Sequence, residues 1–116
     1  MINLEKDDKL RIINIKADGK DAGFYSFFRE NSKEYSEQLN MPVSSFNFVM
    51  IYEHYRGRGY FINSLASLIN SLKTKALVVE YPEDYDKWER IAFKLLSHNL
   101  IKDYKFFDYH LVLYKQ

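Results

Sequence analysis

The first part of the chain alternates hydrophobic and polar residues as strands do. Residues 10–17 fit one strand, Asp18-Gly19 is a strong signal for a tight turn, and residues 22–28 fit the return strand. Residues 30–45 are mostly polar and contain a proline, which favours a loop or one short helix. We therefore predict a β-hairpin followed by an irregular segment.

After this segment the pattern changes between strand and helix periodicity. Residues 46–52 are apolar at nearly every position, which predicts a central strand with both faces covered. Over residues 60–72 the apolar positions recur at the spacing of an amphipathic helix. Residues 76–81 predict a short buried strand, and Pro82 then precedes a second helix.

The C-terminal residues complete an α/β pattern. Asn99 suits the left-handed cap of the second helix, and residues 104–114 supply one long strand or a bent pair of strands. A chain of 116 residues is long enough for one domain and too short for two of ordinary size. We expect a single α/β domain over residues 1–116 with a mixed sheet.

Composition narrows the candidate functions. The 17 Lys and Arg nearly balance the 16 Asp and Glu, so the broad positive field that drives binding to nucleic acid is missing. The chain has no cysteine and only three histidines, at unrelated spacings, which disfavours a metal site and fits a reducing compartment. No apolar stretch approaches the roughly 20 residues that cross a bilayer. We expect a cytoplasmic protein without metal, membrane or nucleic-acid partners.

The joint between the central strand and the first helix is the strongest chemical signal. Residues 55–61 read YRGRGYF and hold two of the four glycines of the chain. A helix N-terminus leaves about four backbone N–H groups without partners, and Gly57 and Gly59 let a phosphate approach them. Arg56 and Arg58 add positive charge. The pattern predicts a site for a ligand that carries a diphosphate.

Two other interpretations of this joint stay open. It fits a plain surface turn with solvated arginines, since it matches neither Walker A nor GxGxxG. It also fits a patch for single-stranded nucleic acid, where arginines and aromatic rings supply charge and stacking. The near-zero net charge argues against the second interpretation.

Residues 51–61 resemble the coenzyme A signature of the GNAT family of N-acetyltransferases, Gln/Arg-x-x-Gly-x-Gly/Ala after a strand. The order of the predicted elements after the motif is similar to that family as well. The resemblance implies a mixed, mostly antiparallel central sheet with a V-shaped splay between two parallel strands, and helices on both faces. It implies an acyl-CoA-dependent N-acyltransferase, with acetyl-CoA as co-substrate and an amine as acceptor.

The same resemblance implies which residues hold the coenzyme. The strand edge at Val49 and Ile51 would pair with the pantetheine arm, as in β-augmentation. Backbone N–H groups of the following turn would bind the pyrophosphate, from the residues Arg56, Gly57, Arg58, Gly59, Tyr60 and Phe61.

Two departures from the family pattern favour an alternative function. Phe61 stands where the signature has Gly or Ala, so its ring either narrows the pyrophosphate site or points into the core. Leu95 or Leu96 stands where the family often has a tyrosine that protonates the departing thiolate. No motif places a substitute among Tyr81, Tyr85 and His98. The alternative is a catalytically inactive GNAT-fold protein that acts as a CoA-binding, protein-interaction or inhibitor module.

The candidates for the catalytic base and for the acceptor site are identified only by their position in the chain and not by a motif. Glu53 lies just beyond the central strand and Glu80 at the carboxyl end of the next one, and either could serve as base. The competing interpretation of both is a surface carboxylate. Only residues 30–45 could cover an acceptor pocket, which favours a large acceptor such as a protein lysine or N-terminus, or a pocket completed by a second subunit in a homodimer.

Overall fold

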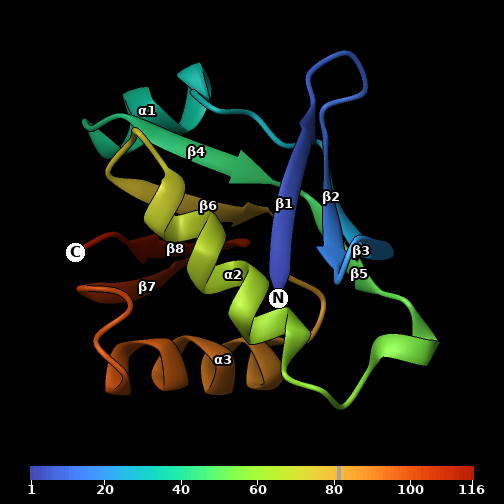
Figure 1. Ribbon diagram of the computed structural model, residues 1–116. Coiled ribbons are helices and arrows are strands. Elements are labelled where there is room, and N and C mark those ends of the chain that lie inside the picture. The colour runs from blue at the N-terminus through green and yellow to red at the C-terminus, as the bar shows by residue number, and fades with distance from the viewer. Residues whose placement is uncertain (81) are drawn as a thin grey trace.

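The strands of the protein fall into two sheets in the computed structural model, which describes residues 1–80 and 82–116 (Figure 1). The first sheet holds, in spatial order, β1 (Ile2–Asp7), β2 (Ile12–Ala17), β3 (Lys20–Ser26) and β5 (Phe48–Ile51). The second holds β4 (Val43–Phe46), β6 (Ala76–Glu80), β8 (His110–Tyr114) and β7 (Asp103–Phe107). The helices are α1 (Lys33–Leu39), α2 (Tyr60–Ser71) and α3 (Tyr85–Ser97), and η1 (Glu53–Tyr55) is a short 3-10 helix.

The predicted N-terminal hairpin is confirmed, but another strand precedes it. Asp18 and Gly19 both have positive φ angles, of 51° and 82°, as the tight turn between β2 and β3 requires. β1 pairs antiparallel with β2 from Ile2 opposite Ala17 onward. β1 was not predicted, because its apolar alternation covers only Ile2 and Leu4.

The predicted central strand over residues 46–52 is wrong in its extent and continuity. The extended chain begins at Val43 and is interrupted at Asn47, which separates β4 from β5. β4 pairs parallel with β6 and is buried at every position, whereas β5 pairs antiparallel with β3 and leaves Phe48 46% exposed. The two halves of one extended segment therefore belong to different sheets.

Helices cover both faces of the second sheet, as predicted. On one face Leu77 and Val79 of β6 join the main core with residues of α2 and α3. On the other face Ala76 and Val78 pack in a smaller cluster with Tyr35 of α1. Adjacent residues of a strand point to opposite faces, so both faces of β6 are apolar.

The C-terminal elements match the sequence pattern closely. Asp84 caps α3, because its carboxylate accepts a hydrogen bond from the backbone N–H of Lys87 at 3.0 Å. Asn99 has the left-handed φ of 58° expected after that helix. The last segment is the bent pair of strands, β7 and β8. Tyr81, expected to end the preceding strand, lies outside the described residues.

Candidate functional site

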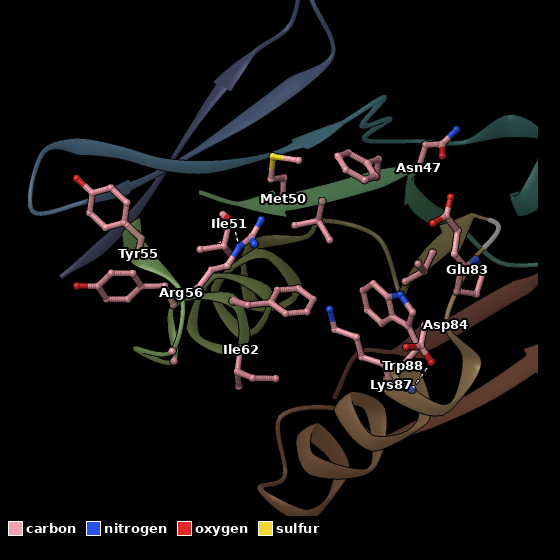
Figure 2. A pocket seen from close by; sticks show the side chains of 18 residues that line it. Asn47, Met50, Ile51, Tyr55, Arg56, Ile62, Glu83, Asp84, Lys87 and Trp88 are labelled. Carbon is pink, nitrogen blue, oxygen red and sulfur yellow. Dashed lines mark hydrogen bonds between the residues drawn. The ribbon is translucent and has the colours of Figure 1, made fainter. Parts of the chain in front are cut away.

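A cavity of about 580 Å³ opens where the two sheets separate. β4 and β6 stay paired as far as Phe46 opposite Val79, after which β5 turns toward β3. This is the predicted V-shaped splay between two parallel strands, formed by β6 and by the segment that starts as β4 and continues as β5. The cavity is lined by the edge of β5, the start of α2 and the start of α3 (Figure 2). Figure 2 shows Tyr55 and Arg56 toward one end of it and Asn47 and Glu83 toward the other.

Within residues 1–80 and 82–116, the edge of β5 that faces the cavity has no strand partner. The backbone N–H of Tyr52 donates to the carbonyl of Ala22 at 2.8 Å, and Met50 lies opposite Phe24. Backbone groups alternate in direction along an antiparallel strand, so those of Val49 and Ile51 point away from β3. β5 is the last strand of its sheet, and both residues line the cavity.

The turn before α2 and the first residues of that helix line the same cavity, although the backbone N–H of Arg56, predicted to bind pyrophosphate, donates to the carbonyl of Glu53 at 3.2 Å. Gly57 and Gly59 have φ angles of 77° and 76°, and Gly59 is the N-cap residue of α2. No side chain caps this helix, and a hydrogen bond from Asn63 to Gly59 begins its backbone ladder. A Cβ atom at Gly57 would meet nothing within 4 Å, so glycine is required there for its φ angle and not for space.

The two arginines of the turn have different surroundings. The Nε of Arg56 donates to the carbonyl of Ile51 at 2.8 Å, so this side chain lies along the free edge of β5. The guanidinium of Arg58 lies 6.0 Å from the ring centroid of Tyr55 and does not line the cavity. Only Arg56 is placed to compete with a ligand for the strand edge.

The ring of Phe61 meets both alternatives that the sequence left open, because it packs against the core and also lines the cavity. Its ring packs edge-to-face on Trp88, with centroids 5.6 Å apart, and against the main core. It also forms part of the cavity wall. The aromatic pair of Phe61 and Trp88 thus joins α2 to α3 and supplies an apolar surface within the site.

The candidate catalytic residues lie outside the cavity lining. Glu53 is exposed at the start of η1. Glu80 ends β6, and its carboxylate accepts a hydrogen bond from the hydroxyl of Tyr35 at 3.0 Å, on the face that α1 covers. The hydroxyl of Tyr85 donates to the carbonyl of Asp108, and neither His98 nor the leucines Leu95 and Leu96 lines the cavity. Tyr81 lies outside the described residues.

The residues that α3, the segment before it and the strand interruption contribute to the cavity were not predicted from the sequence. Asn47, Glu83, Asp84, Lys87 and Trp88 all line the cavity. One signal was present in the sequence: a lysine in the first turn of a helix, where negative charge is favoured. Among the described residues, no group of three side chains is arranged to hold a metal ion, and no helix is long and apolar enough to cross a membrane.

No protein-family model matches the chain, and no curated protein matches its sequence. Its fold, however, is similar to solved structures. A GNAT-family acetyltransferase from Bacillus cereus ATCC 10987 is 14% identical, with a TM-score of 0.55 over 94% of this chain and 72% of that one. An N-acetyltransferase from Staphylococcus aureus Mu50 is 17% identical, with a TM-score of 0.54 over 90% and 66%. The protein yncA from Salmonella typhimurium, solved with its cofactor acetyl-CoA, is 14% identical, with a TM-score of 0.50 over 89% and 61%.

These similarities show that the chain has a divergent GNAT fold. The predicted mixed sheet, the splay beside a parallel strand pair and the helices on both faces are all present. The chain spans between 61% and 72% of the length of these three structures.

Proposed function

We propose that the protein is an acyl-CoA-dependent N-acyltransferase of the cytoplasm, which transfers an acetyl group from acetyl-CoA to an amine. One observation carries the proposal: an uncapped helix N-terminus and a free strand edge border the same cavity. Coenzyme A has a diphosphate and an amide-bearing arm. Helix N–H groups suit the diphosphate, and a strand edge suits the arm.

In this arrangement the pyrophosphate lies at the turn that contains Gly57 and Gly59. The arm then follows Val49 and Ile51 toward the strand interruption at Asn47. Because Arg56 donates to the carbonyl of Ile51 in the structure, a ligand arm must displace its side chain. The released guanidinium can pair with a phosphate oxygen, and such charge-assisted hydrogen bonds are among the stronger ones in proteins.

The acceptor is proposed to be a lysine or N-terminus of another protein. The chain connects β1 to β2 through a short turn, so α1 is the only helix before β4 that could shape an acceptor pocket. An acceptor pocket shaped by one short helix suits a single side chain or chain end that a large partner presents. A second subunit that completes the pocket in a homodimer is the other arrangement compatible with this geometry.

Ligand-induced stabilisation tests coenzyme binding. Acetyl-CoA at about 100 times its Kd should stabilise the protein by about 2.7 kcal/mol and raise its melting temperature by several degrees. Gly59→Glu should abolish the shift, because it strains the turn and places a carboxylate at the phosphate site. Gly19→Glu is the matched control, since Gly19 has a similar φ of 82° in the distant hairpin. A shift that survives Gly59→Glu would contradict this site.

A catalytically inactive CoA-binding or inhibitor protein is the second candidate. It is favoured by the position of Glu53 and Glu80 outside the cavity lining and by Leu95 and Leu96 in place of a tyrosine. The release of free CoA thiol from acetyl-CoA, measured with a panel of amines and proteins, separates the two. Turnover supports the enzyme, and tight binding without thiol release supports the inactive protein.

A further inference from the structure

Lys87 is an exposed cation on the wall of the cavity, and the coenzyme signature does not include it. It lies in the first turn of α3, lines the cavity, and points its side chain into it (Figure 2). A positive charge at this end of a helix opposes the helix dipole, so the position is unfavourable for the helix itself. A ligand with negative charge would offset that cost.

The charges around Lys87 leave its ammonium group available. Asp84 is engaged as the helix cap through the backbone N–H of Lys87, and no ion pair joins Lys87 to a carboxylate anywhere in residues 1–80 or 82–116. The other charged or titratable side chains that line the cavity are Tyr55, Arg56, Tyr60, Glu83 and Asp84. Arg56 is directed to the β5 edge at the other end of the site.

The position of Lys87 along the cavity indicates which part of the ligand it meets. Lys87 and Trp88 come from α3, which follows the β6 side of the splay. The turn at Gly57 and Gly59 comes from the β5 side and binds the diphosphate in the proposed arrangement. In the proposed arrangement the arm runs from that turn toward Asn47, which would place the reactive sulfur in the half of the cavity that α3 borders.

We propose that the ammonium group of Lys87 stabilises the thiolate that leaves during acyl transfer. This inference rests on the proposed function. The acceptor nitrogen attacks the thioester carbonyl carbon, the C–S bond breaks, and its electron pair remains on sulfur. The acceptor nitrogen loses its extra proton to water, and the thiolate is held by Lys87 until it takes a proton and leaves as free CoA. Lys87 thus serves in place of the tyrosine that Leu95 or Leu96 replaces.

The thiol pKa of bound CoA tests this charge effect without any acceptor. A cysteine thiol ordinarily has a pKa of about 8.5, and a cation within contact distance lowers the pKa of a thiol. The ultraviolet absorbance of the thiolate is titrated from about pH 6 to pH 10 in complexes with the wild-type protein and its variants. We expect the pKa of bound CoA to be at least about one unit lower in wild type than in Lys87→Met.

Matched variants isolate the charge of Lys87. Lys87→Arg should keep the lowered thiol pKa, and Lys94→Met, an exposed lysine near the other end of α3, should leave it unchanged. Raising the pH through the thiol pKa should tighten CoA binding to wild type and not to Lys87→Met. Desulfo-CoA, which lacks the sulfur, should show no such change with either protein.

The outcomes separate this inference from the proposed function. Absence of CoA binding to the wild-type protein overturns both. Binding of CoA with an equal thiol pKa in wild type and Lys87→Met overturns only the role of Lys87. Equal losses of affinity for CoA and desulfo-CoA in Lys87→Met would assign Lys87 to a phosphate and would also overturn the thiolate role.

Discussion

Arg56 shows how a single side chain can serve the free and the bound protein in different ways. In the structure its Nε donates to the carbonyl of Ile51, which satisfies an acceptor at an otherwise unpaired strand edge. The proposed ligand would take over that carbonyl through its arm and attract the guanidinium to its phosphates. Arg56 would then exchange one acceptor for another, and the carbonyl of Ile51 would stay hydrogen-bonded through the ligand arm.

Arg56→Ala should weaken binding of a ligand with phosphates and should not weaken binding of one without them. Affinity for CoA should fall about tenfold to a hundredfold, because a charge-assisted hydrogen bond to phosphate contributes about 1.5–3 kcal/mol. Affinity for S-acetylpantetheine, which has no phosphate, should stay the same or rise, because the carbonyl of Ile51 is then free. Titration calorimetry with both ligands measures the difference. Equal weakening of both ligands would mean that Arg56 supports binding of the arm that they share, and would contradict its proposed pairing with a phosphate.

At the scale of elements, the interruption at Asn47 creates the cavity. It lets β4 pair with β6 while β5 pairs with β3, so one extended segment connects two sheets that diverge. The β5 pairing depends on a close approach at Gly23 in β3. A Cβ atom there would lie 2.1 Å from the carbonyl oxygen of Met50. Glycine at this position therefore permits β5 to align with β3 and expose its other edge.

Gly23→Ala should destabilise the protein by about 3 kcal/mol or more, because backbone atoms must move to relieve the contact. Gly19→Ala is the comparison: its Cβ meets nothing within 4 Å, so only the strain of a positive φ remains, at about 1–2 kcal/mol. Urea unfolding of both variants gives the two free energies. A smaller loss for Gly23→Ala than for Gly19→Ala would show that the β3–β5 pairing is looser than described.

At the scale of the whole molecule, Tyr25 connects the first sheet to the helix layer. Its side chain is fully buried in the core, with its hydroxyl 2.7 Å from Ser64 of α2. The hydroxyl of Ser64 itself donates to the carbonyl of Phe61 at 2.8 Å, so Tyr25 is the donor to Ser64. Burial raises the pKa of Tyr25 well above its ordinary value, because the core disfavours a phenolate.

The stability of the protein should therefore fall at alkaline pH in a way that depends on Tyr25. Above about pH 10 the unfolded chain loses the Tyr25 proton while the folded protein keeps it, so unfolding becomes more favourable by about 1.4 kcal/mol per pH unit. Tyr25→Phe should cost about 1 kcal/mol at neutral pH through the lost hydrogen bond, yet show a shallower alkaline decline. Urea unfolding at several pH values from about 9 upward compares the slopes. Burial also raises the pKa of Tyr114, which both proteins share. Parallel slopes would mean that Tyr25 ionises as easily folded as unfolded.

Local signals predicted the elements whose stability is mostly local. The Asp18-Gly19 turn and the helical spacing over residues 60–72 needed no partner to be recognised. β1 was missed because its pairing with β2, and not its own pattern, makes it a strand. The interruption at Asn47 was missed because apolar residues 46–52 fit one strand or two equally well.

The sequence alone specifies the glycine turn at residues 56–59, because positive φ angles and a helix start depend on adjacent residues. It also determined both long helices, through the spacing of their apolar residues. Packing between distant elements leaves the edge of β5 free and brings Lys87 to the same cavity, while Glu53 and Glu80 do not line it. These outcomes depend on how two sheets diverge and how α3 packs across them. Such contacts join residues distant in sequence, and no local pattern specifies them.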